Sequence, residues 1–225
     1  MNNRSDNRFQ VFFETPAYTE FKNLLYNYRL RKHHVSRFVF AGERTLEIGS
    51  GLSPMIRADG RVTYSDLSFT AMSALRKSTA KGCHVVADGG RLPFRAAAFT
   101  TAVCSEVLEH IRDDTRCLRE LGRVLDDRGS LVVTFPHRKA YFANDDRFVA
   151  HFRRYEVDEI KEKLASAGFE AKRIEKVLGP LEKITMMIVV GAIEAGQKIR
   201  RGRRQKSGVP PAHGWLHRLF DMANR

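Results

Sequence analysis

The sequence has few cysteines, and their spacing argues against a small domain stabilised by disulfide bonds or by zinc. Cys83, Cys104 and Cys117 are the only ones in 225 residues, and no two of them stand in a C-x-x-C pair. Three widely spaced thiols argue against a disulfide framework and against a zinc knuckle. The sequence therefore predicts a protein of a reducing compartment.

Long apolar runs are also absent. The longest, residues 186–193, is far shorter than the ~20 residues that a membrane-spanning helix needs. Residues 1–8 are polar and lack the apolar core of a secretion signal. We expect a cytoplasmic protein without a transmembrane segment.

Acidic residues are too few to balance the basic ones, and the formal net charge is +13. Such an excess favours an anionic partner, either nucleic acid or an acidic membrane surface. Part of it is local, because six of the nine residues from Lys198 to Lys206 are Lys or Arg. A solvated basic tail without a dedicated partner is the alternative interpretation.

Short apolar segments alternate with helical patterns through the middle of the chain. Strands are expected at residues 45–48, 62–64, 84–87, 102–105 and 131–135, with helices at 69–77, 115–125 and 157–167 and a sixth strand at 170–177. This order predicts an α/β fold with a doubly wound, mainly parallel sheet. Ligands bind such sheets at the carboxyl ends of the strands.

The two ends of the chain have patterns of their own. From Pro16, apolar residues recur at helical spacing as far as Tyr28, which predicts an N-terminal helical lid over the ligand site. Residues 181–197 are ambiguous between strand and helix. We expect a lid at 1–40, a core domain at 41–180, and an apolar segment with a basic tail at 181–225.

A glycine-rich turn follows the first expected strand. Gly49, Ser50 and Gly51 stand where glycines let the backbone turn sharply and approach a ligand closely. A dinucleotide fingerprint would place its third glycine at position 54, which is Pro54 here. The turn therefore disfavours a nicotinamide-dependent enzyme, which ranks third among the functions considered below.

An acidic residue ends the second expected strand, nineteen residues after Glu47. The Asp66 carboxylate can accept hydrogen bonds from the two ribose hydroxyls of a nucleotide-like cofactor. The alternative is that Asp66 caps the helix that follows. The sequence favours the ribose ligand.

Four segments in this order resemble class I, Rossmann-like S-adenosylmethionine-dependent methyltransferases, in particular their "type 11" group. Residues 47–51 resemble motif I, although Ser53 replaces its last glycine, and residues 88–94 and 103–110 resemble the D-x-x-x-LPF and LEH patterns. The resemblance covers residues 45–170. It implies S-adenosyl-L-methionine as cofactor, S-adenosyl-L-homocysteine as product, and methyl transfer as the reaction.

The resemblance also implies a cofactor-binding set. Asp88 would contact the adenine amino group, Gly89 would let the backbone reach the ring, and Ser105 with Glu106 would lie beneath the methionine portion. The complete expected set is Glu47, Gly49, Ser50, Gly51, Asp66, Leu67, Asp88, Gly89, Ser105 and Glu106.

The sulfonium methyl of such a cofactor is already activated, so the protein mainly has to position the acceptor. A hydroxyl acceptor would also need a general base, and histidine titrates near neutrality. We expect His110 and His137 as the catalytic candidates, with His151 as a further one.

The segment from Glu106 to His110 reads E-x-x-E-H, which resembles a divalent-metal site of some O-methyltransferases, with His151 as a fourth ligand. We expect no metal, because LEH is common in the group without one. The following Arg153 and Arg154 can hold an acidic substrate or form salt bridges to Glu156 and Asp158.

The acceptor is not identified by the sequence, and neither is the oligomeric state. We expect a small-molecule or lipid-linked acceptor, because the aromatic and basic pattern of an RNA-stacking surface is not obvious. An RNA methyltransferase and a non-catalytic S-adenosylmethionine-binding regulator are the alternatives. The apolar segment before the cluster at residues 198–206 predicts peripheral contact with anionic membrane.

Overall fold

The computed structural model describes residues 26–57, 60–79, 81–179, 183–184, 187–188 and 191. The strands in these residues are β1 (Thr45–Ile48), β2 (Val62–Asp66), β3 (Cys83–Val86), β4 (Phe99–Ser105) and β5 (Leu125–Thr134). The helices are α3 (Tyr26–Ser36), α4 (Phe69–Ser78), α5 (Asp114–Val124), α6 (Asn144–Phe148) and α7 (Val157–Ser166). Two 3-10 turns, η1 (Leu108–His110) and η2 (Lys139–Tyr141), complete the elements.

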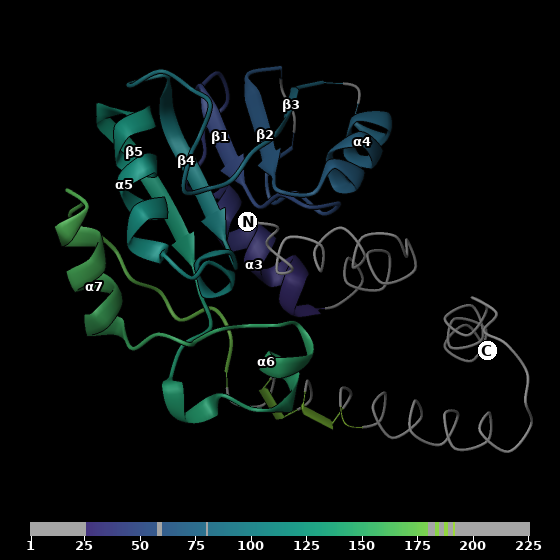
Figure 1. Ribbon diagram of the computed structural model, residues 1–225, viewed down its shortest axis with the longest axis vertical. Coiled ribbons are helices and arrows are strands. Elements are labelled where there is room, and N and C mark those ends of the chain that lie inside the picture. The colour runs from purple at the N-terminus through teal and green to yellow at the C-terminus, as the bar shows by residue number, and fades with distance from the viewer. Residues whose placement is uncertain are drawn as a thin grey trace, which may run out of the picture.

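The five strands form one parallel sheet in the order β3-β2-β1-β4-β5. The chain grows from β1 to β3 in one direction and then returns to pair β4 against the other edge of β1 (Figure 1). β1 and β4 therefore flank the topological switch point, where open α/β sheets bind ligands. The predicted doubly wound fold is confirmed.

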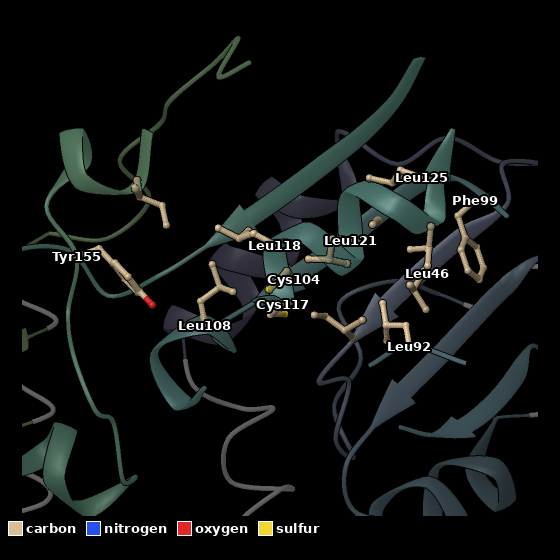
Figure 2. Close-up of a cluster of buried hydrophobic side chains, with 14 residues drawn as sticks. Leu46, Leu92, Phe99, Cys104, Leu108, Cys117, Leu118, Leu121, Leu125 and Tyr155 are labelled. Carbon is tan, nitrogen blue, oxygen red and sulfur yellow. The ribbon is translucent and has the colours of Figure 1, made fainter. Parts of the chain in front are cut away.

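Both faces of the sheet are covered, so the molecule has three layers. Neighbouring residues of β4 belong to different apolar clusters, because successive side chains of a strand point to opposite faces. Cys104 packs with Leu118 and Leu121 of α5 (Figure 2), whereas Val103 packs with Tyr28 of α3 and residues of α4. In accordance with this double burial, all four residues of β1 are buried, including the polar Thr45 and Glu47.

The N-terminal helix extends further along the chain than the sequence pattern indicated. The predicted helix from Pro16 lies largely outside the described residues, and α3 begins at Tyr26. Its Tyr28 hydroxyl and Lys32 Nζ donate hydrogen bonds to the Pro54 carbonyl, at 3.1 and 2.7 Å. These bonds tie α3 to the loop that follows β1.

The predicted sixth strand at 170–177 is wrong. The described chain has no strand there. Ile174 is half exposed, so the segment does not bury an apolar face as a strand of the core would. It instead lies against α3, where Glu175 Oε2 is 3.0 Å from His34 Nδ1. β5 is also longer than expected, because it begins directly at Leu125, where α5 ends.

Most of the C-terminal segment and all of the basic tail lie outside the described residues. Residues 183–184, 187–188 and 191, from the stretch that the sequence left ambiguous, are helical. Within the part of the chain that the structure describes, no helix has the length and apolar character to cross a membrane.

Candidate cofactor and acceptor site

The turn after β1 requires glycine for two physical reasons. Gly49 and Gly51 have φ values of 64° and 54°, which residues other than glycine rarely adopt. A Cβ on Gly49 would lie 2.3 Å from Val107 Cγ2, far inside van der Waals contact. The turn after β1 therefore packs directly on the chain leaving β4.

Glu47 is a buried residue of β1 whose carboxylate holds the far end of this loop. It accepts hydrogen bonds from the amides of Met55 at 2.7 Å and Ile56 at 3.0 Å. Bonds from backbone amides to a carboxylate are charge-assisted and strong. These contacts indicate that Glu47 acts on the cofactor site by shaping the loop.

Asp66 ends β2 and links two backbone segments at the carboxyl edge of the sheet. Its Oδ2 accepts from Gly51 N at 2.9 Å, and its Oδ1 accepts from Ser68 N at 2.8 Å. The N-cap of α4 is Ser68, whose hydroxyl accepts from Ala71 N, so Asp66 is not itself the cap. A carboxylate offers about four acceptor positions, so these bonds are compatible with hydrogen bonds to ribose hydroxyls.

Two buried hydroxyls in the glycine-rich loop are the clearest sign that the loop binds a polar ligand. Within the described structure, neither Ser50 Oγ nor Ser53 Oγ has a hydrogen-bond partner, although both residues are buried. Buried hydroxyls are usually hydrogen-bonded, and an unsatisfied one costs free energy. A polar cofactor lying along the loop would supply the missing partners.

The segment after β3 lines a second side of the candidate cofactor site. Asp88 is exposed, and its Oδ1 accepts from Gly90 N at 2.8 Å, which fixes a tight turn. A Cβ on Gly89 would meet Cys117 Sγ and Ile111 Cδ1 at 3.3 and 3.4 Å, so the turn packs against α5 and its approach. Leu67, next to Asp66, is partly exposed.

The exit of β4 carries a chain of polar contacts. Ser105 Oγ lies 2.8 Å from Thr134 Oγ1 at the end of β5, and Thr134 Oγ1 donates to Glu106 Oε1 at 3.1 Å. Glu106 Oε2 is 3.4 Å from Arg31 on α3. Sequence reasoning missed Arg31 and Thr134, because no motif signals a contact that only the fold creates.

All ten expected cofactor residues thus lie on or directly after the carboxyl ends of β1 to β4. The comparisons with known proteins agree with this geometry, since residues 46–133 match the family model described as "Methyltransferase domain". Residues 46–133 are therefore similar to a methyltransferase domain. The predicted recognition is confirmed.

Curated relatives and solved structures support the assignment. Two probable S-adenosylmethionine-dependent methyltransferases of Mycobacterium tuberculosis are each 31% identical over 153 residues, which is 64% of this chain and 56% of theirs. The chain thus spans little more than half the length of these relatives. A putative methyltransferase solved in complex with the Haloferax volcanii Trm112 activator has a TM-score of 0.65 at 17% identity, covering 79% of this chain and 81% of that one.

A further fold neighbour was solved with its cofactor. Magnesium protoporphyrin IX methyltransferase from Synechocystis, with bound S-adenosylmethionine, has a TM-score of 0.58 at 12% identity, with coverage of 79% and 92%. At these identities the solved structures establish the fold of the methyltransferase domain and not its acceptor.

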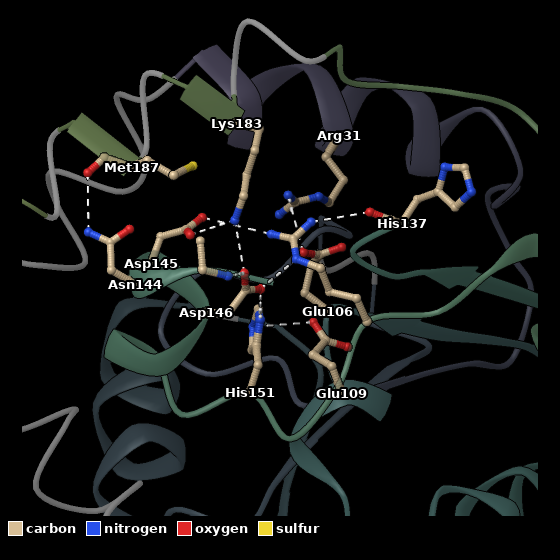
Figure 3. Close-up of polar contacts among 12 residues, drawn as sticks. Arg31, Glu106, Glu109, His137, Asn144, Asp145, Asp146, His151, Lys183 and Met187 are labelled. Atoms are coloured by element: carbon tan, nitrogen blue, oxygen red, sulfur yellow. Dashed lines mark hydrogen bonds and ion pairs between the residues drawn. The ribbon is translucent and has the colours of Figure 1, made fainter. Parts of the chain in front are cut away.

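The two predicted catalytic histidines lie in different surroundings. The His110 ring on η1 packs edge-on against the His151 ring, with centroids 4.6 Å apart. His137, after β5, is partly exposed; its Nε2 is 3.6 Å from Glu156 Oε2, and its ring points away from His151 (Figure 3). The structure therefore pairs His110 with His151 and leaves His137 apart.

A buried polar network lies beside His151. Its Nδ1 is 2.9 Å from Asp146 Oδ1, and the same carboxylate accepts from Arg154 Nε at 2.8 Å and from Lys183 Nζ at 2.8 Å (Figure 3). Burial works to raise the pKa of Asp146, but the hydrogen bonds from His151, Arg154 and Lys183 outweigh it and hold the pKa far below its usual range. Lys183 brings the C-terminal segment into this network.

Arg153 and Arg154 form ion pairs, although not with the predicted partners Glu156 and Asp158. Arg153 Nη1 is 2.9 Å from Asp114 Oδ2, and Arg154 pairs with Asp146. The prediction failed because sequence neighbours were favoured over carboxylates that the fold brings close. Both guanidinium groups stabilise the segment that follows β5.

Proposed function

We propose that this protein is an S-adenosylmethionine-dependent methyltransferase that acts by direct in-line transfer to a small-molecule or lipid-linked acceptor. One observation carries the cofactor assignment: the glycine turn at the switch point holds two buried, unpaired serine hydroxyls beside Asp66. A carboxylate and hydroxyls at this place fit a nucleoside with a polar tail. The 31% identity to probable S-adenosylmethionine-dependent enzymes supports it further.

Each part of the site has a share in holding the cofactor. Asp66 accepts from the ribose hydroxyls, Asp88 and Gly89 face the adenine, and Ser105 with Glu106 lies by the methionine portion. The bound cofactor supplies a methyl group that is already activated for attack. The protein's own contribution is to hold the acceptor in line, and such positioning can lower a barrier by about 7–11 kcal/mol.

The acceptor side consists of the segment from Phe135 to Tyr155 together with α3. Figure 1 shows this segment and α3 beyond the carboxyl ends of the strands, on the side where the ligand loops lie. His110 and His137 are the candidate bases for a hydroxyl acceptor. An RNA acceptor is the second candidate, favoured by the net charge of +13.

The test of the reaction is a labelled-methyl transfer screen with the full-length protein. We expect label from S-adenosylmethionine in quinol, lipid or sugar acceptors and not in RNA, because the sequence does not show the interleaved aromatic and basic pattern of a base-stacking surface. Label in RNA alone would overturn the acceptor class. Tight cofactor binding without transfer to any acceptor would favour the non-catalytic regulator.

We also propose reversible contact with anionic membrane through the C-terminal segment. Ile184, Met187 and Ile188 have helical spacing and are exposed by 53%, 39% and 66%, whereas Lys183 of the same segment is buried against Asp145 and Asp146. An apolar helical face combined with a basic cluster provides two membrane-binding signals. Each basic residue near the surface contributes about 1 kcal/mol.

Liposome flotation tests this contact. The protein should float with vesicles that contain anionic lipid and detach as salt is raised, since salt screens exposed charges. Neutralising the six basic residues at 198–206, or replacing both Ile184 and Ile188 by serine, should each abolish flotation while cofactor affinity stays unchanged. If the intact protein ignores anionic vesicles at low salt, the membrane proposal fails.

A further inference from the structure

Glu109 on η1 carries a buried carboxyl group that the protein leaves unsatisfied. Its side chain is fully buried, and neither oxygen has a hydrogen-bond partner within the described structure. The ring nitrogen His151 Nε2 lies 3.7 Å from Oε1, beyond hydrogen-bond distance. A buried carboxyl in this state is costly, and a ligand that supplies a positive charge would remove the cost.

Two histidines present nitrogen atoms to the same point. Ligand atoms of Glu109, His110 and His151 all lie within 4.8 Å of one another. His151 Nδ1 is engaged by Asp146, which leaves Nε2 directed at Glu109 (Figure 3). A carboxylate bound to one ring nitrogen is the usual way in which proteins orient a histidine whose other nitrogen binds metal.

The backbone holds the two contributing segments together without any ion. Phe152 N donates to the Glu109 carbonyl at 2.8 Å, and His151 N donates to the Asp146 carbonyl at 2.9 Å. The cluster of Glu109, His110 and His151 is thus preorganised by main-chain bonds. Glu106 is held elsewhere, by Thr134 and Arg31, and does not join it.

The local charge balance also favours a cation. The ion pairs around the cluster match three cationic side chains, Arg31, Arg154 and Lys183, with Glu106, Asp145 and Asp146, whereas among the described residues Glu109 has an ion-pair contact only with His151. A bound divalent ion would supply the Glu109 carboxylate with a compensating positive charge.

From this geometry we propose that Glu109, His110 and His151 bind one divalent transition-metal ion, with Asp146 orienting His151. Two imidazoles and one carboxylate suit Zn²⁺ or a similar ion better than Mg²⁺ or Ca²⁺, which prefer oxygen ligands. Three protein ligands leave at least one coordination position open. This inference rests on the proposed function only for its purpose, which is to bind an acceptor oxygen beside the transferred methyl group.

Direct binding to metal-free protein tests the site without any measure of methyl transfer. We expect one Zn²⁺ per chain by calorimetry, and one Co²⁺ whose visible absorption indicates nitrogen and oxygen ligands. Glu109→Gln and His151→Gln should each weaken binding by at least about 100-fold, because each removes a ligand. Asp146→Asn should weaken it by about 10–100-fold, as expected for a residue that orients a ligand.

His137→Gln is the matched control, because His137 is a neighbouring histidine outside the cluster and should bind the ions as the unaltered protein does. Thermal unfolding with and without Zn²⁺ provides a second measurement, since an ion bound only by the folded state raises the unfolding temperature. The rise should vanish in Glu109→Gln. Calorimetric titration with S-adenosylmethionine in the presence of a metal chelator measures cofactor binding without any metal. It therefore distinguishes a failure of the metal site from a failure of the proposed function.

Two results would overturn the metal site. One is folded protein that binds S-adenosylmethionine but takes up no Zn²⁺ or Co²⁺. The other is binding of these ions with an affinity that Glu109→Gln and His151→Gln leave unchanged, which would place the ions elsewhere on the chain. Occupancy would also correct the expectation from the sequence that no metal binds.

Discussion

Replacing Asp66 by alanine is expected to weaken S-adenosylmethionine binding by about 100-fold or more. Two hydrogen bonds from ribose hydroxyls to a charged acceptor contribute roughly 1.5–3 kcal/mol each, and every 1.4 kcal/mol is tenfold in affinity. The carboxylate also holds Gly51 N and Ser68 N, so its loss loosens the turn that lines the site. Calorimetric titration of the folded variant measures the loss.

Ser68→Ala separates the two contributions of Asp66. The Ser68 hydroxyl caps α4 by accepting from Ala71 N at 3.1 Å, and it belongs to the same turn. Its removal should cost about 1 kcal/mol of stability and leave cofactor affinity nearly unchanged. Equal losses of affinity in both variants would show that turn distortion alone explains the effect, and unchanged affinity in Asp66→Ala would remove Asp66 from the site.

The parts of the fold that could be predicted from the sequence are those set by local patterns. The strand ending at Asp66 and the helix α7 were predicted because apolar periodicity and flanking glycine mark them within a few residues. The glycine turn was predictable because its spacing from β1 is local. Residues 170–177 were misassigned because apolar residues at Ile174 and Val177 suggested a strand that buries no face.

The acceptor side could not be predicted in the same way, because its contacts join residues far apart in the chain. Glu109 and His151 are separated by 42 residues, and Lys183 reaches Asp146 across 37. The sequence shows that these histidines and acidic residues are present, but it does not show which of them lie together in the fold. From the sequence, His110 and His137 are therefore equal candidates, whereas the fold associates His110 with His151 and Glu109.

Asp114, at the start of α5, supports the prediction with the largest effect on stability. It is buried, and it accepts from Arg153 Nη1 at 2.9 Å, Tyr155 Oη at 2.8 Å and Lys163 Nζ at 2.9 Å. One carboxylate thus links α5 to α7 and to the segment that follows β5. No sequence motif identifies it.

Asp114→Ala should lower the free energy of unfolding by about 3 kcal/mol, at the low end for a buried ion pair because Arg153 and Lys163 remain partly exposed. For a chain of this size that is about 6–12 °C in unfolding temperature. The Tyr155 hydroxyl loses its partner in a fully buried position. Asp113→Ala is the control, because exposed Asp113 only caps α5 through Arg116 N and should cost about 1 kcal/mol.

The contribution of Asp114 should also depend on pH in a defined direction. Burial works to raise the pKa of this carboxyl, but the hydrogen bonds from Lys163 and Tyr155 and the nearby charges of Lys163 and Arg153 lower it overall. A carboxyl whose pKa is lower in the folded state stabilises it above the unfolded pKa of about 3.9, and that stabilisation disappears as the pH falls through the folded value. The stability difference between the unaltered protein and Asp114→Ala, measured by denaturant unfolding, should therefore be constant from about pH 5 to 7 and shrink below about pH 4. A difference that grows in acid, or one no larger than that of Asp113→Ala at neutral pH, would show that the carboxylate does not join these elements.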